Sequence, residues 1–186
     1  MKKIKIYSVV SLDGYTARTD GDIDWAMDWV AEHTAPGGND YGFNDFAKTT
    51  GSAIVNMPYY YLIRSYDVCW PLAGMKSYVL ADPNFGVPAD KDTNVFPWAA
   101  DDSKADEMIN RLLDEGEGDI WIVGDYSLIS FFAEQGLISE VVLNILPVTL
   151  GEGQRLIFGS RESAWKLTDT KIHDNGVVQL KYSLNI

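Results

Sequence analysis

The segment Asp119–Ile129 is the clearest candidate for binding chemistry in this sequence. Its first half, Asp119–Val123, is short, apolar and rich in β-branched residues, which predicts a buried strand. Gly124 then turns the chain, and Asp125 can cap the helix that follows. A strand that leads through glycine into a helix presents backbone N–H groups and the positive end of the helix dipole, where α/β proteins bind phosphates and dinucleotides. The segment therefore predicts a nucleotide corner, unless the Asp125 carboxylate takes those N–H groups itself.

An acidic stripe is the second candidate. Asp24, Asp28 and Glu32 recur at i, i+4 and i+8 on a predicted helix. One carboxylate in a pocket could protonate or hydrogen-bond a heterocyclic substrate, because desolvation would raise its pKa towards neutrality. A solvent-facing helix surface explains the same spacing and is the commoner case. We take Asp24 as the candidate catalytic carboxylate and Tyr41 as a second candidate contact to substrate.

Other catalytic and metal-binding patterns find little support in the sequence. There is no Walker loop, and the Gly-Glu-Gly at 151–153 opens no helix, so it is a poor dinucleotide fingerprint. The two histidines, His33 and His173, are far apart in sequence and there is no cysteine pair, so we expect no metal site. Neither histidine lies in a nucleophile context that would predict a serine triad. The run Tyr59–Tyr61 is more typical of packing and surface than of a stacking platform.

The elements that must position these residues alternate along the chain, which predicts a mainly parallel sheet with helices on both faces. Asn175-Gly176, flanked by alternating residues, predicts an antiparallel hairpin at the C-terminal end. Strands are expected at Ile4–Ser11, Ser52–Asn56, Lys76–Ala81, Thr93–Phe96, Asp119–Val123, Glu140–Leu146, Thr168–His173 and Val177–Leu184. Helices are expected from Asp22 or Asp24 to His33, at Asp40–Lys48, from Pro58 to Ser65, from Asp101 or Asp102 to Glu115, and from Asp125 to Gln135.

The composition restricts the class of protein. With 186 residues and 46% hydrophobic content, the chain is expected to form one folded domain, 1–186, without repeats or linkers. The net charge of −12 disfavours nucleic acid and anionic membranes as partners, since both need a basic footprint. The lone cysteine, Cys69, allows no internal disulfide. We read no signal peptide and no membrane-spanning run, so the expected location is the cytoplasm.

Four stretches resemble the dihydrofolate reductase-like family, in its branch related to the C-terminal reductase domain of bacterial bifunctional riboflavin biosynthesis enzymes. They are Ile6–Tyr15, Asp20–Trp25, Trp70–Leu80 and Asp119–Phe158, and they follow the family order over almost the whole chain. The resemblance implies an α/β, three-layer fold with a mixed, mostly parallel sheet of about eight strands. It also implies a homodimer, with NADPH at the switch point of the sheet and a pyrimidine- or pteridine-like substrate beside the nicotinamide. In such an enzyme hydride passes from NADPH to a C=N or carbonyl carbon, while the protein positions the reactants and supplies a proton.

The resemblance places the cofactor at the ends of the strands and at the helix starts that follow them. The candidate cofactor-binding residues are Val9, Val10, Ser11, Asn56, Met57, Pro58, Ala81, Asp82, Val123, Gly124, Asp125, Tyr126 and Ser127.

Three of these segments depart from the family pattern. The family's Gly-Arg followed by a Lys-Thr-like pair is here Asn56–Tyr59, with no cation and with Pro58, which has no N–H. The Ser-Arg pair for the adenosine 2′-phosphate is here Ala81-Asp82, and the Gly-Gly pair is Gly124-Asp125. Losing a charged hydrogen bond costs about 1.5–3 kcal/mol. Two or three such losses would weaken NADPH binding by orders of magnitude.

Two functions therefore remain open. The first is an NAD(P)H-dependent reductase of a small pyrimidine-, pteridine- or flavin-like compound, similar to 5-amino-6-(5-phosphoribosylamino)uracil reductase or dihydrofolate reductase. A narrower form of it uses NADH, because Asp82 could accept a hydrogen bond from a free 2′-hydroxyl; Asp82→Arg would then favour NADPH. The second function is that of a degenerate homologue without a nucleotide, which binds a small ligand or a partner protein.

Overall fold

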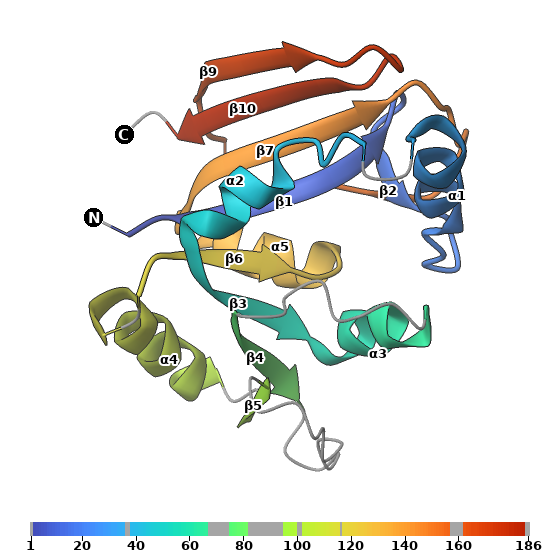
Figure 1. Cartoon of the computed structure of the whole chain (residues 1–186). Coiled ribbons are helices and arrows are strands. Elements are labelled where there is room, and N and C mark those ends of the chain that lie inside the picture. Colours follow the sequence, from blue (N-terminus) through green and yellow to red (C-terminus); the bar gives the residue numbers. More distant parts are fainter. Residues whose placement is uncertain are drawn as a thin grey trace.

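The computed structural model describes residues 2–35, 38–66, 75–81, 95–99, 102–115, 117–156 and 162–184. Within them lies an eight-stranded sheet in the order β5-β4-β3-β6-β1-β7-β10-β9 (Figure 1). Its strands are β1 (Ile4–Ser11), β3 (Thr50–Asn56), β4 (Lys76–Ala81), β5 (Val95–Ala99), β6 (Asp119–Val123), β7 (Ile138–Leu146), β9 (Trp165–Ile172) and β10 (Val178–Leu184). A separate two-stranded sheet pairs β2 (Tyr15–Ala17) with β8 (Gln154–Arg155). The helices are α1 (Asp24–His33), α2 (Phe43–Lys48), α3 (Met57–Ser65), α4 (Asp102–Glu115) and α5 (Tyr126–Glu134).

The directions of the strands confirm the predicted fold class. All neighbours from β5 to β7 run parallel, whereas β10 is antiparallel to both β7 and β9. The β9–β10 hairpin turns at the predicted Asn-Gly pair, where Gly176 has a φ of 89°, a conformation that favours glycine. The result is a mixed, mostly parallel sheet that ends in a C-terminal antiparallel hairpin.

Side chains that alternate along β3 contribute to two cores on opposite faces of the sheet. Ile54 joins Phe132 of α5 in one core, to which α4 also contributes. Ala53 and Val55 join Phe46 of α2 in the other core, together with residues of α3. The sheet is therefore covered on both faces, which gives the three layers visible in Figure 1.

Several boundaries differ from the predicted ones. Helix α2 begins at Phe43 and not at Asp40, because Tyr41 and Gly42 have φ values of 48° and 75° that a helix cannot continue through. Strand β5 begins at Val95, and its predicted first residue, Thr93, lies outside the described residues, as do the predicted cap Asp101 and Cys69. Strands β2 and β8 were not predicted, since each is only two or three residues long. Across the described part of the chain, no helix has both the length and the apolar character to span a membrane.

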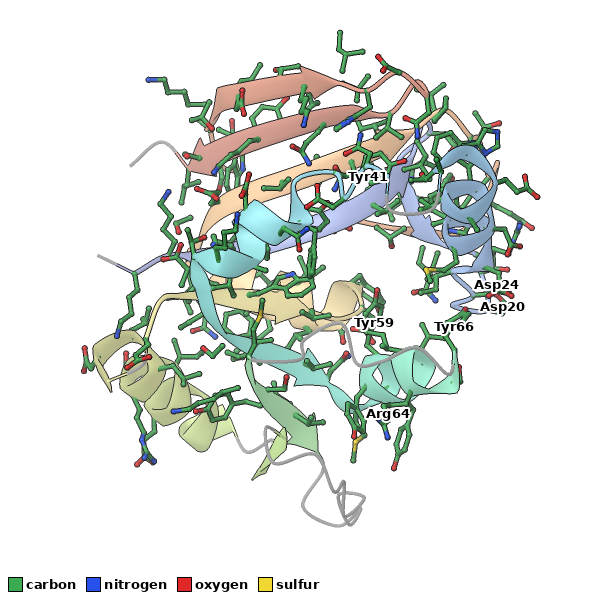
Figure 2. The ribbon with its side chains drawn as sticks, viewed as in Figure 1. Asp20, Asp24, Tyr41, Tyr59, Arg64 and Tyr66 are labelled. Atoms are coloured by element: carbon green, nitrogen blue, oxygen red, sulfur yellow. The ribbon has the colours of Figure 1, made fainter. Side chains whose placement is uncertain are left out.

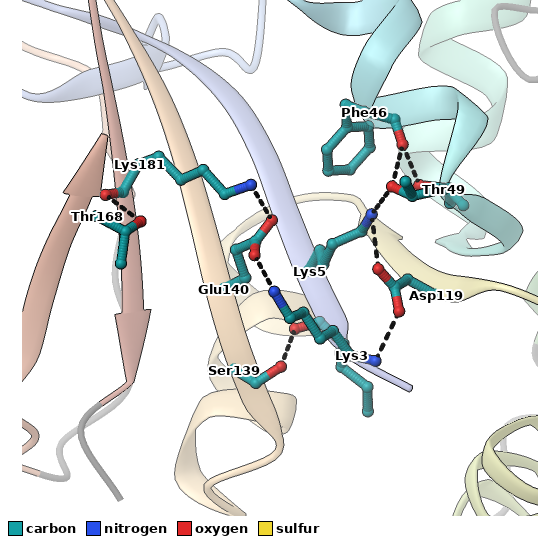
Figure 3. Close-up of polar contacts among 11 residues, drawn as sticks. Lys3, Lys5, Phe46, Thr49, Asp119, Ser139, Glu140, Thr168 and Lys181 are labelled. Atoms are coloured by element: carbon teal, nitrogen blue, oxygen red, sulfur yellow. Dashed lines mark hydrogen bonds and ion pairs between the residues drawn. The ribbon is translucent and has the colours of Figure 1, made fainter. Parts of the chain in front are cut away.

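A buried lysine joins β1 to β6 at the N-terminal end of the sheet (Figure 3). Lys5 is only 2% exposed, and its ammonium nitrogen lies 3.1 Å from the Asp119 carboxylate. The same nitrogen donates to the Thr49 hydroxyl at 2.8 Å and lies 4.4 Å from the centre of the Phe46 ring. Burial lowers the pKa of Lys5, while Asp119 acts to raise it.

A buried glutamate extends this ionic cluster to β7 and β10 (Figure 3). Glu140 lies between the ammonium groups of Lys3, at 2.6 Å, and Lys181, at 3.1 Å. Burial opposes its ionisation, but the hydrogen bonds and charges of the two lysines outweigh burial and lower the pKa of Glu140. The backbone N–H of Lys3 also donates to Asp119 at 2.9 Å. Strands β6, β1, β7 and β10 are therefore tied together at one end of the sheet.

Replacing Lys5 by alanine should destabilise the protein by about 3 kcal/mol, because Asp119 would lose its buried partner. Lys48→Ala is the matched control, since Lys48 pairs with Asp45 at the surface, with both side chains exposed, and should change stability by no more than about 0.5 kcal/mol. Urea denaturation of the two variants measures the difference. Equal losses of stability in the two variants would show that the buried pair stabilises the protein no more than the surface pair does.

Candidate functional site

Strands β1 and β6 separate soon after they begin. They pair only at Ile4 with Ile120 and at Lys5 with Trp121. β1 stays paired with β7 as far as Ser11, and β6 stays paired with β3 as far as its last residue. From β1 the chain continues to β3, towards the β5 edge of the sheet, whereas from β6 it continues to β7, towards the β9 edge. The connections thus run in opposite directions at β1 and β6, which makes their separation the switch point of the sheet.

A cavity of about 980 Å³ lies at this separation. Its walls come from β1 and β6, from α3, from the loop 20–23 and the start of α1, from the corner 124–126, and from β8. This volume is at the upper end of the range of small-molecule sites. Ligands of α/β proteins bind at this kind of position, at the carboxyl ends of the parallel strands.

Six of the predicted cofactor-binding residues line this cavity. They are Val9, Pro58, Val123, Gly124, Asp125 and Tyr126. Their neighbours do not line it: these are Val10, Ser11, Asn56, Met57 and Ser127. Ala81 ends β4, which β3 separates from β6, and Asp82 lies outside the described residues.

The glycine at the corner is required by packing. A Cβ at Gly124 would lie 2.8 Å from the Asn56 side-chain oxygen and 2.8 Å from a methyl carbon of Leu128. That Asn56 oxygen is buried and has no hydrogen-bond partner among the described residues. The glycine therefore permits the close approach of β3 to the start of α5, whether or not a phosphate binds nearby.

Asp125 caps α5, as the sequence predicts. Its carboxylate accepts hydrogen bonds from the backbone N–H of Ser127 at 2.9 Å and of Leu128 at 3.3 Å, and from the Ser127 hydroxyl at 2.5 Å. These are N–H groups that an anion at a helix N-terminus would use. A phosphate at this corner would have to displace the carboxylate and approach its negative charge.

Neither predicted catalytic residue lines the cavity. Asp24 is exposed, and its carboxylate hydrogen-bonds the hydroxyl of Tyr66, which rises from the end of α3 towards the loop before α1 (Figure 2). Burial and this hydrogen bond raise the pKa of Tyr66 to about 12. Asp28 and Glu32, the rest of the acidic stripe, are exposed, as a solvent-facing helix surface requires.

Tyr41 is held in a hydrogen-bond network away from the cavity. Its hydroxyl lies 2.8 Å from that of Thr34 and accepts from the Asn175 amide at 2.6 Å. Its backbone carbonyl accepts from the Tyr7 hydroxyl at 2.9 Å and from the Gln179 amide. Tyr41 thus joins the C-terminal hairpin to β1. It contacts the cavity only indirectly, through its hydrogen bond with Tyr7, which lines the cavity.

The sequence interpretation missed the part that Tyr59 has in the cavity wall. The three adjacent tyrosines of α3 have three different environments: Tyr59 lines the cavity, Tyr60 is buried in the core, and Tyr61 is 50% exposed. A run of three on a helix spans most of one turn, so one of them had to face the carboxyl ends of the strands. Burial raises the pKa of Tyr59, which keeps its hydroxyl protonated at neutral pH.

The described residues that line the cavity carry more negative than positive charge. They include three carboxylates, Asp20, Asp22 and Asp125, and one guanidinium, that of Arg155. Arg155 donates to the Tyr15 hydroxyl at 3.1 Å and lies 4.6 Å from the centre of the Tyr15 ring. This excess of carboxylates disfavours anionic ligands.

Comparisons with known proteins agree with this geometry. Residues 89–179 match the family model described as the RibD C-terminal domain. The Bacillus subtilis protein YwjB, itself uncharacterized, is 29% identical over 182 residues, covering 97% of each chain. A candidate riboflavin biosynthesis protein from Shewanella sp. PV-4 has a similar structure, with a TM-score of 0.84, 22% identity and 99% of each chain covered.

The fold extends to dihydrofolate reductase itself. The Enterococcus faecalis enzyme, in a complex with NADP(H) and a compound named RAB-propyl, superposes with a TM-score of 0.62 at 14% identity. The superposition covers 99% of this chain and 97% of that enzyme. Residues 89–179 are thus similar to the RibD C-terminal domain, and the chain as a whole has the dihydrofolate reductase-like fold.

An aspartate, Asp13, joins two loops beside the cavity. The Asp13 carboxylate accepts from the Ser11 hydroxyl at 2.5 Å and from the backbone N–H groups of Leu150, at 3.1 Å, and Gly151, at 2.7 Å. These bonds join the turn after β1 to the loop before β8, and the two residues of β8, Gln154 and Arg155, line the cavity. The Ser11 hydroxyl first, and then the two N–H groups, lower the pKa of Asp13 from 3.8 to about 2.

Asp13 should therefore make stability depend on acid pH in a defined window. Because its pKa is lower in the folded protein, ionised Asp13 stabilises the fold fully above 3.8, and the contribution disappears as the pH falls towards 2. The Asp13→Asn variant should be less stable than the wild type at neutral pH, and this gap should close within that window. Urea denaturation across the pH range measures it, with Asp28→Asn as an exposed control. A stability difference between the wild type and Asp13→Asn that stays unchanged down to a pH of about 2 would contradict this role of ionised Asp13.

Proposed function

We propose that this protein is an NAD(P)H-dependent reductase of a small heterocyclic compound of pyrimidine, pteridine or flavin type. The observation that carries the proposal is the cavity where β1 and β6 separate, which extends from the Gly124 corner to the loop before α1. A relative of the same fold, the Enterococcus faecalis dihydrofolate reductase, has NADP(H) in its complex. By the same analogy we propose a cytoplasmic enzyme that acts as a homodimer.

The cavity wall suits the nicotinamide ring of the nucleotide better than its pyrophosphate. Ile6, Val9, Ile122 and Val123 give apolar surface from both separating strands, suitable for a planar ring and for excluding water. The bound cofactor would supply a hydride. The pyrophosphate finds no comparable support, because Asp125 takes the first N–H groups of α5 and the α3 start has Pro58 in its first turn.

A second function is favoured by that same corner. A protein that keeps the cavity and has lost the nucleotide would bind a small ligand without reducing it. The Asp125 cap and the carboxylates of Asp20 and Asp22 on the wall support this alternative. The choice between the two functions depends on whether NADPH or NADH binds.

Titration of the protein with NADPH and with NADH tests the proposal. We expect binding in the millimolar range or tighter, and stronger binding when the charge at position 125 is removed. Asp125→Asn keeps a side chain that can cap the helix and removes the repulsion, and should tighten binding by about tenfold. Asp125→Gly also frees the N–H groups and should tighten it further.

The matched control is Asp28→Asn, a neutralisation on the exposed face of α1 that should leave nucleotide affinity unchanged. If neither nucleotide binds the wild type at millimolar concentration, the reductase proposal fails. If both bind but the position-125 variants bind no better than the control, the pyrophosphate does not lie at this corner.

A further inference from the structure

One wall of the cavity is aromatic. Tyr7 of β1, Phe43 of α2 and Trp121 of β6 all line it and contact one another, with ring centres 5.5 Å apart for Tyr7 and Phe43 and 5.4 Å apart for Phe43 and Trp121. Tyr59 of α3 packs against the same cluster and lines the cavity as well. We call these four residues the aromatic wall. Aromatic rings bind planar ligands by stacking and edge contacts.

The polar groups of the aromatic wall are mainly donors. The Tyr7 hydroxyl is engaged, since it donates to the Tyr41 carbonyl at 2.9 Å. The Tyr59 hydroxyl has no hydrogen-bond partner among the described residues, and only burial acts on its pKa, which is raised. The indole N–H of Trp121 is buried and has no partner in the described part of the chain. A buried donor without a partner is costly, so a ligand that brings an acceptor gains from meeting it.

The carboxylates that line the cavity disfavour phosphate. Asp20 and Asp22 line it beside the start of α1, and Asp125 lines it at the start of α5. Arg155 is the one cationic side chain among the described lining residues, and its guanidinium is already engaged with Tyr15. A phosphate dianion in this space would meet three carboxylates within a partly desolvated site, where like charges repel strongly.

We propose that the substrate is an uncharged planar ring compound that carries a carbonyl or ring-nitrogen acceptor and no phosphate, and that the Tyr59 hydroxyl is the donor that orients it on the aromatic wall. The assignment names the substrate class of the proposed reductase and in that respect rests on it. Binding to the aromatic wall does not itself need a nicotinamide nucleotide, so the two can be tested separately.

Riboflavin and FMN form a matched pair of probes. They share one planar ring system with two carbonyls and differ by a single phosphate. Isothermal titration of the full chain with each probe, without nicotinamide nucleotide, should show riboflavin binding at least about tenfold more tightly than FMN. The double variant Asp20→Asn/Asp22→Asn should reduce that ratio by strengthening FMN binding.

Tyr59→Phe removes the hydroxyl and keeps the ring, and should weaken riboflavin binding about three- to tenfold. Tyr61→Phe is the control, because Tyr61 lies on the same helix, is exposed and does not line the cavity. Thermal unfolding of both variants confirms that they are folded. Riboflavin that fails to bind, FMN that binds as tightly, or equal effects of the two tyrosine variants would each overturn the proposal. Riboflavin binding in a protein that binds no nicotinamide nucleotide would support the aromatic wall and refute the reductase.

Discussion

The ion pair between Lys5 and Asp119 is the interaction on which the arrangement of the sheet most depends. It joins β1 to β6 at the only place where these two strands are paired. Glu140, held by Lys3 and Lys181, adds β7 and β10 to the same end (Figure 3). Charges this deeply buried are tolerated only when they are paired, so the cluster fixes which strands lie side by side. Beyond it, β1 and β6 are free to separate.

The cavity is the consequence of that separation. A sheet paired along its whole length would fill this space with backbone hydrogen bonds, whereas here residues of both strands line a cavity. The strand ends, the α3 start and the α5 start form its walls. The corner at Gly124 and Asp125 has the strand-glycine-helix geometry that suits a phosphate. The Asp125 carboxylate, however, accepts the backbone N–H groups that a phosphate would bind. The corner therefore has a shape that suits a phosphate and a charge that opposes one.

The sequence predicted the features that depend on local pattern. Alternation of apolar strands with helices was enough for the layers and the parallel sheet, and the Asn-Gly pair was enough for the hairpin. The Asp125 cap followed from one residue at a strand-to-helix turn. The layers, the hairpin and the helix cap each depend on residues that are close together along the chain, and such local patterns can be recognised without a structure.

Features that depend on distant residues could not be predicted in this way. β2 and β8 are too short to show a periodic pattern, and they pair across about 140 positions, between Tyr15 and Arg155. The sequence also could not show that Tyr59 faces the cavity while Tyr60 enters the core, because that depends on how α3 is rotated against the sheet. For the same reason Tyr41 was a plausible substrate contact from sequence alone, although its hydroxyl is taken up by Thr34 and Asn175.

We propose that the space between β1 and β6 is the ligand site of this protein. A crystal structure of the protein soaked with riboflavin and NADH tests it most directly. We expect electron density for a planar ring between the two strands, beside Tyr59 and Trp121. Density for both compounds at other surfaces, with this cavity filled by water alone, would contradict it.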